Sequence, residues 1–170
     1  FSLKEGLARG YFPGPRALVC GRSITCTRGH FHMCNEVVDG PEQMRRSVRG
    51  LVHEGADFIK LMASGGGTQG SIPGRASYSV EELRAAVTEA EHFGRWTAAH
   101  CRASQAMERA VAAGVRILEH AEFLDPDGVA RFDTRLADRM LANDTWISPT
   151  LQAWMGSPRL AELLEDQQAK

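Results

Sequence analysis

The chain alternates short apolar runs with amphipathic helix patterns, and this alternation limits the folds open to it more than any other feature. The apolar runs have the length and composition of buried strands, and they cover residues 17–24, 57–63, 96–101, 116–121 and 146–150. A helix pattern follows each run. Strands and helices that alternate in this way form right-handed βαβ units, so we expect an α/β protein with a parallel sheet.

The helices are marked by recognisable start and stop residues. Pro41 opens a helix that Gly55 closes. Ser79 and Glu82 have the spacing of a capping box, in which a hydroxyl and a carboxylate satisfy the exposed amides of a helix start; this helix ends at Gly94. Further helices are predicted over 104–113, from 125 to about 142, and from 157 onwards.

Two architectures fit this order, a doubly wound open sheet and part of a (β/α)8 barrel. An open sheet is expected to carry a glycine fingerprint after its first strand, but the loop 25–40 contains His30 and His32 and no GxGxxG. A complete barrel needs eight strands and about 250 residues. With five strands in 170 residues, we predict a partial barrel, residues 1–170 forming a single domain. Because the chain does not begin with Met, we expect it to be a fragment of a longer parent.

Charge and composition exclude several classes of partner. The 20 Lys and Arg residues nearly balance 21 Asp and Glu residues, which argues against a nucleic-acid partner. No apolar stretch approaches the roughly 18 residues of a membrane-spanning helix, so no membrane partner is expected. The four cysteines form no CxxC pair and are too sparse for a disulfide scaffold, so we expect reduced thiols and a cytoplasmic location.

Three basic side chains lie at or near the C-terminal ends of consecutive predicted strands: Lys60, His100 and His120. In either architecture these strand ends meet at one mouth. A lysine in an apolar strand is costly unless it is paired or neutralised, and neutral imidazole is the commonest metal ligand, so the pattern favours a divalent metal site over hydrogen-bonded core histidines. Glu119 precedes His120, and strand alternation therefore predicts that its side chain points towards the helices.

Four motifs in these strands and loops resemble the metal-dependent amidohydrolase superfamily, nearest to the branch with imidazolonepropionase-like proteins and Xaa-Arg or Xaa-Pro dipeptidases. They occur in the family's order, each on its expected strand, and the resemblance extends from about residue 14 to 150. The motifs are Gly55-Ala-Asp-Phe-Ile-Lys60-Leu-Met-Ala-Ser-Gly-Gly-Gly67, Tyr78-Ser-Val-Glu-Glu-Leu83, Ala98-Ala-His100 and Glu119-His-Ala-Glu-Phe123.

The resemblance implies a (β/α)8 barrel of which the predicted strands are the third to the seventh. It also implies that Lys60 is carboxylated and bridges two divalent ions, for which we expect zinc, and that His100 and His120 ligate one of them. The family's HxH motif and its general-base Asp would lie on strands outside this segment. His30-Phe-His32 has the HxH form but follows the third strand, so we interpret both histidines as substrate contacts.

The chemistry implied is hydrolysis of an amide or related C–N bond. The loops after the strands carry cationic and imidazole groups, which suit a small polar substrate with a carboxylate, such as an N-acyl amino acid, a dipeptide or a cyclic amide. Tyr78 lies near the strand mouths, where substrate contact and packing are both open. We expect the parent protein to form a homo-oligomer.

Two other functions remain open at this point. Lys60 also resembles the Schiff-base lysine of deoxyribose-phosphate-type aldolases, but these expect further lysines at neighbouring strand ends, and the other two lysines here are the near-terminal Lys4 and Lys170. The third hypothesis is an inactive barrel fragment whose outer strands expose unpaired edges.

Overall fold

The computed structural model describes residues 1–151 and contains one sheet of six strands in the order β2-β1-β3-β4-β5-β6. All neighbouring strands are parallel, as predicted. The strands are β1 (Ile24–Thr25), β2 (Glu36–Val37), β3 (Ile59–Met62), β4 (Thr97–Ala103), β5 (Ile117–Leu124) and β6 (Trp146–Ser148).

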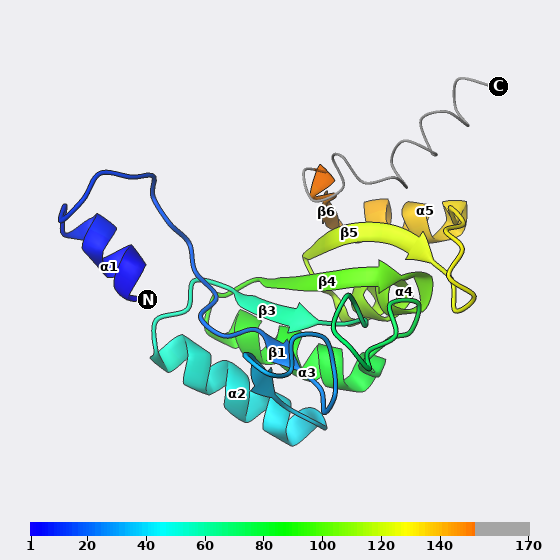
Figure 1. The fold of residues 1–170 in the computed structure, drawn as a ribbon, viewed down its shortest axis with the longest axis horizontal. Helices are drawn as coiled ribbons and strands as arrows, with labels where there is room; N and C mark the ends of the chain where they lie inside the picture. The colour runs from blue at the N-terminus through cyan, green and yellow to red at the C-terminus, as the bar shows by residue number, and fades with distance from the viewer. Residues whose placement is uncertain (152–170) are drawn as a thin grey trace.

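From β2 onwards helices alternate with the strands, and α2, α3 and α4 lie side by side along one face of the sheet (Figure 1). The helices are α1 (Ser2–Ala8), α2 (Pro41–His53), α3 (Val80–His92), α4 (Ser104–Ala113) and α5 (Thr134–Ala142). The capping box of α3 is confirmed, since Ser79 Oγ accepts the Glu82 amide and the Glu82 carboxylate accepts the Ser79 amide. Within residues 1–151, no helix is long and apolar enough to cross a membrane.

The hydrophobic core lies between the sheet and the helices. Ile59, Leu61, Ala99 and Leu118 point towards the helices and are fully buried there. Because side chains alternate along a strand, the residues between them point to the opposite face of the sheet. That face carries the polar residues of the predicted site, beginning with Lys60 in β3.

The structure differs from the sequence predictions at the edges of the sheet. The first strand is confined to Ile24–Thr25, because the preceding chain bonds to the loop before β3 instead of to a strand: Val19 donates to Asp57 Oδ2 at 2.8 Å. The short strand β2 within the loop 25–40, and α1, were not predicted.

The predicted helix from residue 125 was placed too early. The chain first makes a turn in which the Gly128 amide donates to the Asp125 carbonyl at 2.9 Å, with Gly128 in the left-handed region. The helix α5 starts at Thr134, where the Asp133 carboxylate accepts the amides of Arg135 and Leu136. The helix predicted from residue 157 lies outside the described residues.

Candidate active site

Three imidazole rings meet at the C-terminal end of the sheet. The ring of His100 stacks on that of His30, with centroids 4.5 Å apart and planes inclined by 29°. His100 also meets the ring of His120 edge-on, with the centroids 4.7 Å apart. The structure therefore brings the two histidines among the predicted metal ligands together with His30, one of the predicted substrate contacts.

His100 lies in β4 and is 5% exposed. Its Nε2 is 3.0 Å from the carbonyl oxygen of Gly65, and because a carbonyl can only accept, Nε2 carries the hydrogen. Burial lowers the pKa of His100 to about 3, so its ring is neutral at pH 7. Nδ1 of this neutral ring therefore keeps an unshared electron pair, the form in which histidine binds a metal ion.

His120 reaches the cluster through an irregularity in β5. Its backbone is left-handed, with φ of 70°, as is that of Ala121, and the register between β4 and β5 shifts beyond this point. The Thr150 hydroxyl donates to the Pro149 carbonyl, so it accepts its 2.7 Å hydrogen bond from His120 Nδ1. Nε2 is then the nitrogen with the unshared pair. Burial lowers the pKa of His120 as well.

Lys60 is paired with Glu119, whose Oε2 lies 2.5 Å from Nζ. The prediction that Glu119 points towards the helices was wrong. The register pairs Met62 with His100 and His100 with Glu119, which places Glu119 on the same face of the sheet as Lys60. Regular alternation would instead have turned His120 towards the helices, and the left-handed backbone reverses this.

His30 lies in the loop after β1 and is buried. The Phe31 amide donates to Thr68 Oγ1, and the Thr68 hydroxyl is in turn 2.9 Å from His30 Nδ1. The Thr68 oxygen can accept from the Phe31 amide and also donate to or accept from Nδ1, so both neutral tautomers of His30 satisfy this contact. Burial, followed by the charge of Lys60, lowers the pKa of His30.

The other two predicted substrate contacts lie apart from the three rings. His32 is half-buried, and its Nδ1 is 3.0 Å from the Gly29 carbonyl. Tyr78 is buried in the core, where its hydroxyl donates to the Val38 carbonyl at 3.0 Å and burial raises its pKa.

An ion pair beside the histidines was not predicted. Arg102 Nε and Nη2 donate to the two carboxylate oxygens of Glu122 at 2.7 and 2.9 Å, and both charges act on the pKa of His120. Each residue follows a predicted ligand by two positions, since Arg102 follows His100 and Glu122 follows His120. Residues two positions apart lie on the same face of a regular strand, so this spacing is the sequence signal that could have indicated Arg102 and Glu122.

The donor set fits part of a metal site. Within residues 1–151, no group of three or more His, Cys, Asp or Glu side chains is arranged to hold a metal ion. However, His100 and His120 each donate one ring N–H to an oxygen and retain one unshared pair. This pattern of an oriented imidazole is typical of metal-binding histidines. Together with Lys60, these two residues are the ones that could hold a metal.

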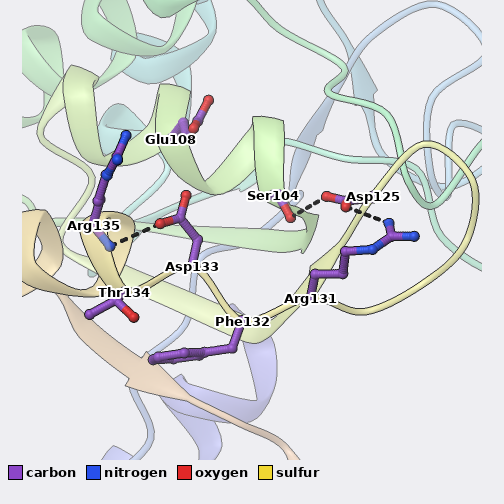
Figure 2. A pocket seen from close by; sticks show the side chains of 8 residues that line it. All are labelled: Ser104, Glu108, Asp125, Arg131, Phe132, Asp133, Thr134 and Arg135. Carbon is purple, nitrogen blue, oxygen red and sulfur yellow. Dashed lines mark hydrogen bonds and ion pairs between the residues drawn. The ribbon is translucent and has the colours of Figure 1, made fainter.

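A separate cavity of about 440 Å³ lies where α4 and α5 begin (Figure 2). Two of its charged groups are paired with each other, since Asp125 binds Arg131 and also accepts a hydrogen bond from Ser104. None of the predicted site residues lines it. The lining residues are Ser104, Glu108, Asp125, Arg131, Phe132, Asp133, Thr134 and Arg135.

The sequence model described as "Amidohydrolase family" matches residues 2–167. The chain belongs to this family. The predicted superfamily is thereby confirmed. Ochratoxinase from Aspergillus niger is 38% identical to this amidohydrolase chain over 92 residues, which are 54% of the chain and 19% of ochratoxinase.

Solved structures agree with this assignment. A Xaa-Pro dipeptidase with methionine bound in its active site is 31% identical, with a TM-score of 0.80, and the match covers 89% of this chain and 39% of the dipeptidase. The structure of A. niger ochratoxinase has 25% identity and a TM-score of 0.79 over 88% of this chain and 39% of ochratoxinase. The chain thus spans about two fifths of these structures, and the prediction of a partial (β/α)8 barrel is confirmed.

Proposed function

We propose that this chain forms the central part of a metal-dependent hydrolase that cleaves an amide or related C–N bond. The observation that carries the proposal is the hydrogen bonding of the histidine cluster. His100 and His120 each donate one ring N–H to an oxygen and present one unshared nitrogen pair, whereas the His30 ring is held by Thr68. The His100 and His120 rings are thus suited to a cation, and we assign His30 to a substrate oxygen. The relatives include a dipeptidase and ochratoxinase, which supports the same reaction class.

In this proposal carboxylated Lys60, His100 Nδ1 and His120 Nε2 would hold two divalent ions, for which we expect zinc. Bound divalent ions supply Lewis-acid chemistry, which polarises the scissile carbonyl and activates water. The Gly65 carbonyl and the Thr150 hydroxyl hold the two ligand rings in place. The burial that lowers both histidine pKa values keeps the rings neutral at pH 7, as metal binding requires.

The substrate we propose is a small polar molecule with a carboxylate, such as an N-acyl amino acid, a dipeptide or a cyclic amide. His30 would donate its Nε2 hydrogen to a substrate oxygen. His32 would contribute from the same loop, where it is partly open to solvent. Tyr78 is buried and would support the site by packing, since its hydrogen bond to the Val38 carbonyl ties the chain after the Gly-rich loop to the chain after β2.

Replacement of Lys60 tests the proposal. Lys60→Ala should abolish hydrolysis of dipeptides and N-acyl amino acids by the full-length protein, and zinc with a short carboxylic acid should restore part of it, because a small carboxylate supplies the two missing oxygens. Lys4→Ala is the matched control, since Lys4 is bound to Asp57 in another part of the molecule. Full activity of Lys60→Ala would refute the role of carboxylated Lys60.

A Schiff-base role for Lys60 is less well supported. A Schiff-base lysine is expected to have further lysines at neighbouring strand ends, whereas β4 carries His100 and β5 carries Glu119 and His120. Borohydride trapping with a carbonyl substrate separates the two hypotheses. A stable adduct on Lys60 would support the aldolase-type reaction.

A further inference from the structure

The pairing of Lys60 with Glu119 spans three strands at the centre of the site. Lys60 lies in β3 and Glu119 in β5, on either side of β4, which carries His100. The two side chains are 12% and 27% exposed, and Nζ lies 2.5 Å from Oε2. A part-buried ammonium needs such a partner, so charge neutralisation alone would account for the contact.

We propose that Glu119 is also the positioning residue for carboxylated Lys60, an inference that rests on the proposed function. Carboxylation leaves one hydrogen on the lysine nitrogen. Glu119 Oε2 accepts a hydrogen bond from that N–H, in the same position in which it accepts one from the Lys60 ammonium. A hydrogen bond along this direction fixes the rotation of the planar carbamate and leaves both of its oxygens for metal ions.

The chemistry balances with carbon dioxide as the co-reactant. The Lys60 ammonium first gives one proton to solvent water, and the unshared pair of the resulting neutral Nζ forms a bond to the carbon of carbon dioxide while one C=O electron pair moves onto oxygen. The nitrogen then gives one of its two remaining hydrogens to solvent water as a second proton and keeps the other. Glu119 binds the hydrogen that stays, so it changes neither its charge nor its place.

The backbone of β5 supports a specific role for Glu119. His120 adopts a left-handed conformation with φ of 70°, and this turns its ring to the same side of the sheet as the preceding Glu119. Consecutive residues of one strand therefore serve Lys60 and the histidine cluster. Strained backbone of this kind persists where surrounding structure enforces it, and it is concentrated at functional sites.

No other carboxylate within residues 1–151 is paired with Lys60. Glu122, the next carboxylate along β5, is bound to Arg102 instead. It therefore provides a matched control: a second acid of the same strand, three positions away, with the same chemistry and a different partner.

The experiment is NMR of the full-length zinc protein equilibrated with ¹³C-bicarbonate, which reports the carbamate carbon directly. Glu119→Gln should keep the wild-type carbamate signal, because the amide oxygen accepts the same N–H. Glu119→Met fills similar space without an acceptor and should lower the signal about tenfold, the size of effect that a lost supporting contact has at a metal site. Glu122→Gln should keep the signal.

Loss of the signal in Glu119→Gln, or full signal in Glu119→Met, would overturn the positioning role. If Glu119→Met does not fold, Glu119→Asp decides, since it keeps the charge but shortens the reach. A weaker carbamate signal in Glu119→Asp than in Glu119→Gln supports the positioning role, and a stronger signal in Glu119→Asp overturns it. Absence of a carbamate in the wild-type protein would instead refute carboxylated Lys60, the proposed function on which this inference depends.

Discussion

The rings of His30 and His100 lie in stacked contact, with their centroids 4.5 Å apart, although one residue belongs to the loop after β1 and the other to β4. Different hydrogen bonds hold the two rings. His100 donates from Nε2 to the Gly65 carbonyl and keeps an electron pair on Nδ1, whereas His30 contacts the Thr68 hydroxyl through Nδ1. The proposed metal ligand and the proposed substrate contact are thus held against each other by packing.

Removing the His30 ring should weaken catalysis without removing the metal. A hydrogen bond to a charged group contributes about 1.5–3 kcal/mol, so His30→Ala in the full-length protein should lower kcat/KM by about 10- to 100-fold. Zinc content, measured by elemental analysis, should not change. His92→Ala, at an exposed position of α3, serves as the control. Loss of zinc in His30→Ala would instead show that His30-Phe-His32 is the HxH ligand motif.

The glycine loop tests the same contact without altering a histidine. A Cβ added at Gly66 would lie 2.4 Å from Cε1 of the His30 ring, whereas a Cβ at Gly67 would meet nothing within 4 Å. Gly66→Ala should therefore displace His30, lower kcat/KM as His30→Ala does, and cost about 1–3 kcal/mol of folding free energy in thermal denaturation. Gly67→Ala should match the wild type. Equal behaviour of the two variants would contradict the placement of His30.

The order of the strands and the meeting of Lys60, His100 and His120 could be predicted from the sequence. Short apolar runs and helix caps such as Ser79 are local signals, and the parallel topology then places strand ends together. The direction of Glu119 could not be predicted. It depends on the register between β4 and β5 and on the left-handed backbone of His120, which result from packing across strands.

Local signals also misled at particular turns. Asp125 and the proline after it have the chemistry of a helix start, but Gly128 completes a tight turn first, and Asp133 provides the cap that α5 uses. Similarly, the ion pair between Arg102 and Glu122 could not be predicted from local signals. It depends on the packing of β4 against β5, which brings the two side chains together.

The buried histidines should make the metal-free protein sensitive to acid. His100 has its pKa lowered to about 3 by burial, against 6.5 when unfolded, so below pH 6.5 the unfolded chain binds a proton that the folded chain does not. The free energy of unfolding should therefore fall as pH decreases from about 6.5 towards 3, by about 2 kcal/mol at pH 5 from this residue. Urea denaturation at pH 7 and pH 5 measures the change.

A variant assigns that acid sensitivity to His100. In His100→Gln the free energy of unfolding should fall by about 2 kcal/mol less between pH 7 and pH 5 than in the wild type. In His92→Gln, a substitution at an exposed position, the fall should equal that of the wild type. Identical pH dependence in His100→Gln and the wild type would mean that His100 does not stay neutral in the fold.

The hydroxyl that orients His120 should affect metal affinity. Thr150→Val removes the acceptor 2.7 Å from His120 Nδ1, so the ring loses its fixed tautomer and direction. Loss of such a supporting partner typically costs about 10- to 100-fold in metal affinity. Competition with a chromogenic chelator measures this in the full-length protein. Thr145→Val, just before β6, is the control, and unchanged affinity in Thr150→Val would argue against His120 as a ligand.

The metal content of the full-length protein tests the central claim most directly. Elemental analysis of the purified protein should give about two divalent ions per chain, as a bridged site requires. In a His100→Ala/His120→Ala double variant the content should fall, because both imidazole ligands are gone. Removal of the metal should abolish hydrolysis of the amide substrate, and zinc should restore it. A protein that is active and binds no metal would contradict the account.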